Sequence, residues 1–130
     1  MSANITWAAI ALGLAVGVSA GPTSASDTGL ATSLHDSRIE GGRLCLADHS
    51  HSGQGSGSSR KQAEVSAIQA WASFTSFEYG SSWASFSNAA GKSIKCSGSG
   101  ASWSCSLEAR PCRSGGGGAP LRKVRRHVRG

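Results

Sequence analysis

The sequence lacks the cysteine spacing of a thioredoxin-like or zinc-ribbon protein. None of its four cysteines belongs to a C-x-x-C pair, the spacing that brings two sulfurs to one centre from a tight turn. Cys96, Cys105 and Cys112 instead follow one another at C-x8-C and C-x6-C spacing, and Cys45 lies far upstream. An even number of widely and irregularly spaced cysteines favours disulfides if the chain is exported.

Long apolar runs are also scarce. The run from Trp7 to Val18 is short for a bilayer span, which takes about 20 residues, but it has the length of a signal-peptide core. Patterns of small residues typical of cleavage sites end at Ala20 and at Ala25. We predict a signal peptide over residues 1–25 and a periplasmic or secreted protein, with cleavage after Ala25 preferred because it leaves no proline beside the new terminus.

Catalytic motifs are absent or incomplete. Residues 90–93 end like a P-loop, but Phe86 occupies the first glycine position and the predicted order of helix, loop and strand is reversed. The G-x-S-x-G pattern occurs only at residues 17–21, inside the predicted signal peptide, so no nucleophile elbow is expected in the domain. Glu64, Glu78 and Glu108 are not expected to form a catalytic pair. Glu64 near a helix start and Glu108 on the polar face of a strand are expected to be ordinary solvated charges. We therefore predict no catalytic residues and a protein that is not an enzyme.

Acidic residues are few, with 7 Asp and Glu against 13 Lys and Arg and a net charge of +6. Five of the positive charges lie in a tail that follows a glycine linker, at Arg122, Lys123, Arg125, Arg126 and Arg129. Each such charge near an anionic lipid surface is worth about 1 kcal/mol. The tail predicts anionic lipid or lipopolysaccharide as a partner of an exported protein, and nucleic acid as a partner of a cytosolic one. A solvated, disordered tail without a specific partner is the alternative.

Alternating side chains predict a hairpin near the C-terminus. Apolar and polar residues alternate through residues 93–97 and 102–110, and turn residues fill the gap between them. Two strands folded about that turn place Ile94 opposite Leu107 and gather the apolar residues on one face. We therefore predict a half-buried antiparallel hairpin here.

The same register suggests a disulfide pairing. It places Cys96 opposite Cys105, and opposed side chains lie about 4.5–5.5 Å apart at Cβ, within reach of a disulfide. Cys45 would then pair with Cys112. Four cysteines allow three connectivities, and a register shifted by two residues also keeps the apolar face inward, so the other pairings stay open.

Helical patterns fill the middle of the sequence. Ser59 and Gln62 have the S-x-x-Q spacing of a capping box, which predicts a helix from there to Gly80. Its inward stripe is predicted to be Val65, Ile68, Trp71, Ala72 and Thr75. A second, shorter helix fits residues 81–90 and ends at Gly91.

The segments that precede the long helix are predicted to contain one strand and otherwise irregular structure. Residues 43–47 are a candidate strand, and the Gly/Ser-rich residues 50–59 are predicted to be a mobile loop. We expect residues 26–37 to be disordered, residues 38–113 to form one small α+β domain, and residues 114–130 to be a linker and basic tail. The predicted fold is a strand, two helices and a C-terminal β-hairpin, stapled by disulfides that each contribute about 2–4 kcal/mol.

One stretch of the sequence carries a recognisable pattern. The runs AEVSAIQAW, EYGSSWASFSNAAGKSIKC and WSCSLEARPC follow one another from Ala63 onward. They resemble a loosely defined group of small exported bacterial proteins of unknown function. The shared pattern falls here on Trp71, Tyr79-Gly80, Trp83, Phe86, Cys96, Cys105 and Ala109-x-Pro111-Cys112. The resemblance implies structural roles for these aromatic residues and cysteines, and it implies no activity.

Two histidines are candidate metal ligands. His49 and His51 follow Asp48, and zinc, copper or nickel accept such ligands. The two imidazoles share a face in an extended segment, but His35 is the nearest further imidazole, and holding a metal in a Gly/Ser loop costs ordering entropy. We therefore expect a polar loop that titrates near pH 6–7, with no metal site and no cofactor.

These observations predict an exported, non-enzymatic binding module or cell-envelope accessory protein whose basic tail contacts polyanions. A small secreted hydrolase, with a catalytic carboxylate or a site at His49 and His51, is one alternative. A cationic host-directed or antimicrobial effector is another.

Overall fold

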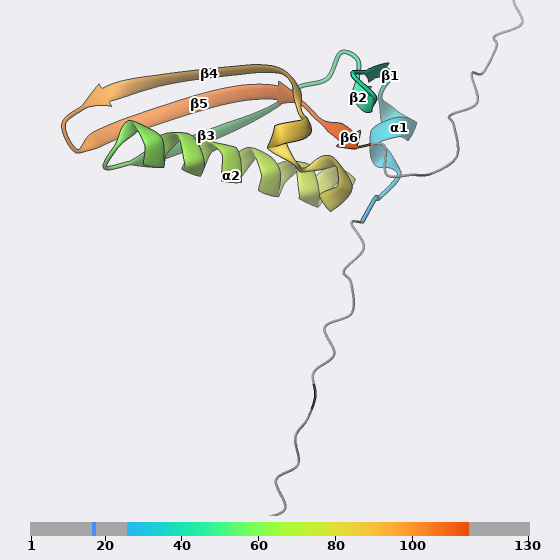
Figure 1. The fold of residues 1–130 in the computed structure, drawn as a ribbon, viewed down its shortest axis with the longest axis horizontal. Coiled ribbons are helices and arrows are strands. Elements are labelled where there is room, and N and C mark those ends of the chain that lie inside the picture. The colour runs from blue at the N-terminus through green and yellow to red at the C-terminus, as the bar shows by residue number, and fades with distance from the viewer. Residues whose placement is uncertain (1–16, 18–25, 115–130) are drawn as a thin grey trace, which may run out of the picture.

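The computed structural model describes residues 26–114 and the isolated Gly17. These residues form an α+β fold with two helices, six strands in two antiparallel sheets and two disulfides (Figure 1). The rest of the predicted signal peptide and the tail from residue 115 to 130 lie outside the described residues, so both stay predictions. No helix among the described residues is long and apolar enough to cross a membrane.

The larger sheet carries the long helix on one face (Figure 1). Its strands, in spatial order, are β3 (His51–Gly57), β5 (Ser102–Arg110) and β4 (Ala90–Ser99). The helix that packs on it is α2 (Arg60–Tyr79). The main hydrophobic cluster, which includes Trp71 and Leu107, lies between them.

The smaller sheet lies beyond one end of the larger one, beside the short helix α1 (Leu30–Leu34) (Figure 1). Its strands, in spatial order, are β1 (Ser37–Glu40), β2 (Arg43–Leu46) and β6 (Cys112–Ser114). Two short 3₁₀ turns, η1 (Ser81–Trp83) and η2 (Phe86–Asn88), connect α2 with β4. The single strand predicted upstream of α2 is therefore incomplete, because β1 and β3 flank it.

The hairpin and its disulfide form as predicted. In the β4–β5 ladder Cys96 pairs with Cys105 and Ile94 pairs with Leu107. The disulfides are Cys96–Cys105 and Cys45–Cys112, which confirms the predicted pairing. The second disulfide joins β2 to β6, which follows the hairpin and leaves the larger sheet. Disulfides are typical of proteins in an oxidising, extracytoplasmic compartment.

The long helix begins and ends as predicted, but its buried face differs. Ser59 is the N-cap, and its hydroxyl accepts a hydrogen bond from the Gln62 amide at 3.2 Å. The buried residues repeat every four positions, at Ala63, Ala67, Trp71, Thr75 and Tyr79. The predicted stripe is correct for Trp71 and Thr75 and wrong for Val65, which is 41% exposed. Small alanines rather than larger aliphatic residues face the sheet because the two backbones approach closely.

That close approach also overturns the predicted mobile loop at residues 50–59. The segment contains β3, and its alternate glycines face α2. A Cβ atom at Gly53 would lie 2.8 Å from the Trp71 amide nitrogen, and one at Gly55 would lie 2.6 Å from the Ser66 Cβ. The glycines are therefore contact positions that admit the helix, while the intervening Ser and Gln residues are exposed.

The predicted second helix over residues 81–90 is wrong. Trp83 is buried in the cluster with Tyr79, whereas Phe86 packs against the main cluster with Trp71. Ser85 between them is extended, with φ −80° and ψ 109°. A helix would place Trp83 and Phe86 on the same face, whereas the extended Ser85 directs them into different clusters, and the chain forms the turns η1 and η2 instead.

Residues 26–37, predicted to be disordered, are ordered against the end of α2. The Thr28 amide donates to the Tyr79 carbonyl at 3.0 Å, and the Thr28 hydroxyl donates to the Glu78 carbonyl at 2.9 Å. Asp27 accepts a hydrogen bond from the Trp83 indole at 3.1 Å. These contacts satisfy carbonyls that a helix C-terminus leaves without partners, which is why this polar segment folds.

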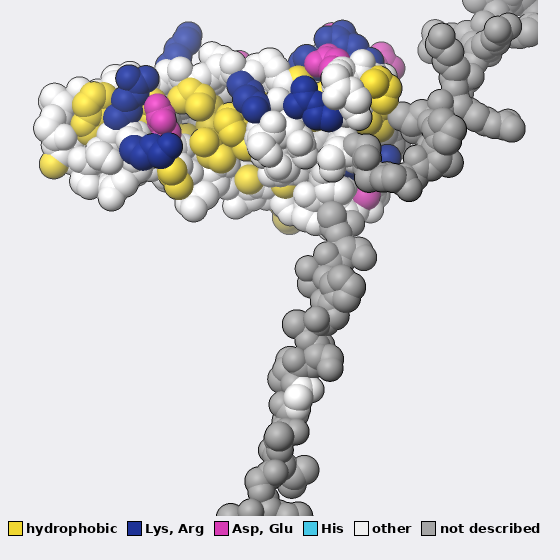
Figure 2. All heavy atoms as spheres, viewed as in Figure 1, with side chains coloured by type: hydrophobic (Ala, Val, Ile, Leu, Met, Phe, Trp, Pro, Cys, Tyr) yellow, Lys and Arg dark blue, Asp and Glu magenta, His cyan; other side chains and the backbone are white. Residues whose placement is uncertain are grey.

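An ion pair connects the two sheets. Arg110 of β5 donates to both carboxylate oxygens of Glu40 in β1 at 2.8 Å, and also to the Leu46 carbonyl. Hydrogen bonds from Arg110 and then from Arg38 lower the pKa of Glu40 to about 2. Elsewhere on the face in Figure 2, basic side chains are interspersed with acidic, hydrophobic and uncharged ones.

Candidate functional site

Three side chains with metal-binding atoms meet at the end of α2. His51 is the first residue of β3, His49 lies in the connection from β2, and Glu78 is in the last turn of α2. One ligand atom of each lies within 4.8 Å of the others. We call these three residues the histidine–glutamate cluster. Sequence analysis identified the two histidines but missed Glu78, which only the packing of α2 on β3 brings to them.

The imidazole of His51 is buried and held on one side by a hydroxyl. The residue is 3% exposed, and its Nδ1 lies 2.9 Å from the Thr75 Oγ1. That hydroxyl donates its proton to the Trp71 carbonyl at 2.8 Å. Because a hydroxyl has one proton to donate, Thr75 accepts from His51, and Nδ1 carries the hydrogen.

The other nitrogen of His51 faces a carboxylate. Nε2 lies 3.0 Å from the Glu78 Oε2, within ion-pair distance, but the two atoms are not aligned as a hydrogen bond, and Nε2 has no hydrogen-bond partner among the described residues. In the neutral imidazole this atom holds a lone pair, and a lone pair beside a carboxylate oxygen is repulsive. The contact is therefore favourable only when a cation, either a proton or a metal ion, lies at Nε2.

Burial disfavours the proton as the cation at Nε2. Desolvation lowers the pKa of His51 below its usual value, although the nearby Glu78 carboxylate opposes the shift. Desolvation and then the neighbouring His35 lower the pKa of His49, again against the influence of Glu78. Both imidazoles are therefore neutral at pH 7, the form in which histidine binds metals. The expectation of a solvated loop titrating near pH 6–7 is wrong for His51.

Aromatic rings enclose the cluster on several sides. The His35 ring stacks on His49 with centroids 4.0 Å apart, and the Tyr79 ring stacks on His51 at 5.0 Å. Tyr79 is fully buried, and its hydroxyl has no hydrogen-bond partner in the described part of the chain. Burial raises the pKa of Tyr79 to about 12, so the hydroxyl stays protonated.

The cluster is accessible from solvent on the His49 side. A recess of about 160 Å³ is lined by Leu34, His35, Asp36, Asp48 and His49. The Glu78 side chain is 31% exposed. Solvent therefore contacts His49 and Glu78, whereas the Nε2 of His51 is buried.

The other residues considered in the sequence do not form a site. Glu64 pairs with Arg60 at 3.3 Å, and Glu108 is exposed on β5. The P-loop-like residues 90–93 lie at the start of β4, where Lys92 donates to the Ser87 carbonyl. The basic residues of the predicted tail lie outside the part of the chain that the structure describes.

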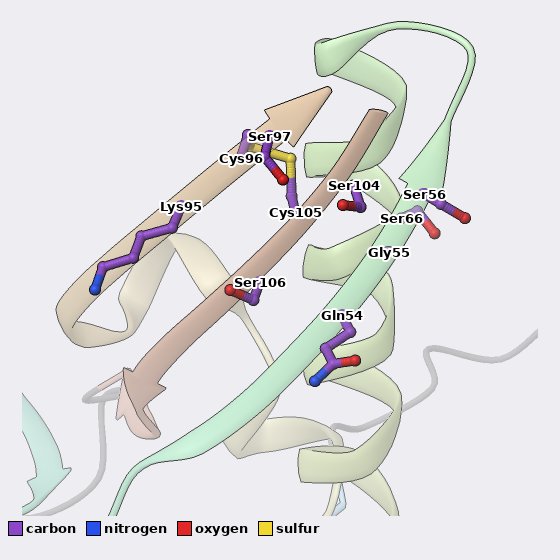
Figure 3. Close-up of a pocket in the computed structure, with 10 residues that line it drawn as sticks. All are labelled: Gln54, Gly55, Ser56, Ser66, Lys95, Cys96, Ser97, Ser104, Cys105 and Ser106. Atoms are coloured by element: carbon purple, nitrogen blue, oxygen red, sulfur yellow. A yellow bond between two sulfur atoms is a disulfide. The ribbon is translucent and has the colours of Figure 1, made fainter. Parts of the chain in front are cut away.

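A larger recess of about 680 Å³ lies over the β3–β5–β4 sheet. Figure 3 shows its ten lining residues, which come from all three strands and from Ser66 of α2. Half of them are serines, and Lys95 is the one ionisable side chain among them. This lining offers hydrogen bonds but no acid–base pair, so the histidine–glutamate cluster is the stronger candidate site.

Comparisons with known proteins do not assign the site. No family model matches the chain, and neither curated proteins nor solved structures show a significant match. The resemblance to small exported bacterial proteins therefore stays a prediction.

Proposed function

We propose that the protein is exported and captures a divalent metal ion at the histidine–glutamate cluster. One observation carries this proposal: the buried His51 Nε2 faces the Glu78 carboxylate at 3.0 Å without a hydrogen bond. A metal ion between the two groups replaces the repulsion by two coordination bonds. Since the imidazole is neutral at pH 7, no proton has to leave it first.

The cost in entropy of holding a metal is smaller at His51 than a flexible loop would imply. His51 belongs to a strand rather than to a loop, and Thr75 and Tyr79 already fix its ring. Ligands of this kind lie about 2.0–2.2 Å from zinc, so tetrahedral donor atoms are roughly 3.4 Å apart. The His51 and Glu78 atoms at 3.0 Å would have to separate slightly, and the more distant atoms, all within 4.8 Å of one another, would have to approach. Two imidazoles and one carboxylate leave a further coordination position for solvent.

Export is supported by the disulfides together with the predicted signal peptide. Both disulfides lie within the ordered fold, and such bonds persist in the periplasm and outside the cell. We propose a periplasmic or secreted location, where the domain meets free metal ions in the surrounding solution.

Thermal unfolding with and without Zn²⁺ tests metal capture. At an ion concentration 100 times Kd, binding stabilises the native state by about 2.7 kcal/mol, which raises Tm by on the order of 10 °C in a domain of this size. Glu78→Gln removes the anionic ligand and should abolish the rise. Glu64→Gln is the matched control, since this glutamate lies on the same helix and outside the cluster.

Two results would contradict the proposal. One is a wild-type Tm that does not respond to Zn²⁺ in metal-free buffer. The other is a Glu78→Gln variant that responds as strongly as the wild type and the control, because the ion would then bind elsewhere.

A second role is proposed for the basic tail, because the described part of the chain has eight basic and seven acidic residues and is close to neutral. The tail would hold the domain at anionic lipid or lipopolysaccharide. Sedimentation with anionic vesicles should show binding that weakens with salt and disappears when residues 115–130 are deleted. Equal binding by the truncated protein would rule out this role.

A further inference from the structure

Thr75 is an unexpected residue for its position. It is fully buried in the row of α2 that faces the sheet, between Trp71 and Tyr79. A buried hydroxyl in a helix needs a hydrogen-bond partner, and threonine does not favour the helix over other residues. Valine has nearly the same shape and would fill the space without a polar atom. The hydroxyl therefore calls for an explanation other than packing.

The hydrogen bonds around Thr75 form a relay with one direction. The Trp71 carbonyl accepts the hydroxyl proton at 2.8 Å, so the oxygen is left to accept from the His51 Nδ1 at 2.9 Å. The carbonyl has no proton to return, and the relay cannot reverse. It favours the tautomer in which Nδ1 is protonated and the Nε2 lone pair faces Glu78.

Without the relay, the other neutral tautomer of His51 would be lower in electrostatic energy. The opposite tautomer would place a proton on Nε2, 3.0 Å from the Glu78 oxygen, where the negative charge of the carboxylate attracts it. That tautomer would block the atom that receives the ion. Thr75 thus opposes the tautomer that the charge of Glu78 would otherwise favour.

We propose that Thr75 is a positioning residue that keeps the His51 Nε2 free for a borderline first-row ion, of which Zn²⁺ is the representative. This inference rests on the proposed metal-binding function and names its ion class. Imidazole nitrogen suits Zn²⁺, Ni²⁺ and Cu²⁺, whereas Mg²⁺ and Ca²⁺ prefer oxygen ligands. Two imidazoles and one carboxylate therefore select the first group. A hydrogen bond that orients a metal-binding histidine is typically worth a factor of 10–100 in affinity.

The test compares Thr75→Val, which keeps the shape and removes the hydroxyl, with Thr75→Ser, which keeps the hydroxyl. In metal-free protein at one fixed neutral pH, imidazole ¹⁵N–¹H correlations report which His51 nitrogen is protonated. We expect the Nδ1–H tautomer in the wild type and in Thr75→Ser, and the Nε2–H tautomer in Thr75→Val. Far-UV circular dichroism shows whether each variant is folded.

Zn²⁺ affinity, measured by competition with a chromophoric chelator, supplies the second readout. Thr75→Val should bind Zn²⁺ about 10–100 times more weakly, and Thr75→Ser should restore most of the affinity. Mg²⁺ should not compete with Zn²⁺ for the wild-type protein.

Several outcomes separate this inference from the function on which it rests. A folded Thr75→Val variant with the wild-type tautomer and Zn²⁺ affinity would overturn the role of Thr75 and leave metal capture intact. Effective competition by Mg²⁺ would overturn the ion class. A wild-type protein that binds no Zn²⁺ would overturn the function and the ion class together, while the tautomer in metal-free protein would still decide what Thr75 does.

Discussion

Adding one methyl group at Gly53 should disturb both the fold and the site. A Cβ atom there would lie 2.8 Å from the Trp71 amide nitrogen and 2.9 Å from the Trp71 Cβ. The first is a backbone atom and the second is the first atom of the side chain, so no side-chain rotation relieves the overlap. The helix α2 therefore has to move away from β3. Overpacking of this kind typically costs about 1–3 kcal/mol. In a domain of this size, a loss of about 2 kcal/mol lowers Tm by roughly 8–16 °C.

The same displacement should weaken the metal site. His51 lies two residues from Gly53 on β3, while Thr75 and Glu78 belong to α2, so separation of the two elements lengthens both contacts of the imidazole. We expect Gly53→Ala to lower the urea midpoint and to reduce the Zn²⁺-induced rise in Tm.

Ser52→Ala is the matched control for this prediction, because Ser52 is exposed on the same strand. Its effect should stay within about 0.5 kcal/mol, as for most surface substitutions. A Gly53→Ala protein as stable as this control would refute the interpretation of β3 as a strand whose glycines admit the helix backbone.

Three further predictions concern the disulfides, the ion pair and export. Replacing both cysteines of Cys45–Cys112, which are 67 residues apart, should cost about 4.4 kcal/mol by the loop-entropy relation, against about 2.6 kcal/mol for the hairpin disulfide with a separation of 9; urea unfolding that gives the reverse order would contradict this. Because Arg110 lowers the pKa of Glu40 from 4.5 to about 2, the ion pair should stabilise the fold fully above about pH 4.5 and lose its effect as the pH falls toward 2, so Glu40→Gln should flatten the acid limb of the stability curve. If Glu40→Gln loses stability at low pH in the same way as the wild type, other carboxylates cause that loss. The intact mass of the exported protein should correspond to a chain that begins after Ala25 and lacks four hydrogens, and free thiols on a full-length chain would contradict export.

The sequence predicted those elements whose signal is local. Apolar alternation with a turn between the strands specifies the β4–β5 register, which in turn places Cys96 opposite Cys105. The Ser59 cap and the glycine at residue 80 define the ends of α2. In each case the information lies within a few residues of the element, because hydrogen-bond capping and side-chain alternation act over short distances.

The remaining elements depend on contacts that the local sequence does not reveal. Glycine at alternate positions of β3 resembles a flexible linker, because a strand that packs through its backbone needs no large apolar side chain. The matching indication on α2 was the four-residue spacing of Ala63 and Ala67, because a helix that packs closely on a strand needs small residues at the contact. Thr28 likewise acquires its role only when the end of α2 is in place.

The histidine–glutamate cluster could not be assembled from the sequence for the same reason. His49 and His51 alone are two ligands in an apparent loop, and Glu78 joins them only through the packing of α2 on β3. Thr75 was assigned to the inward stripe of the helix, but its hydroxyl could not be connected with His51 before the fold was known. The available indication of the cluster was a threonine on the predicted inward face of the helix, followed three residues later by a glutamate.

Metal capture is tested by a crystal structure of the protein with Zn²⁺, with anomalous diffraction recorded on both sides of the zinc absorption edge. We expect one anomalous peak per chain, about 2.0–2.2 Å from an imidazole nitrogen of His49, the Nε2 of His51 and a carboxylate oxygen of Glu78. A peak at other residues, or an empty cluster in crystals grown with excess Zn²⁺, would contradict it.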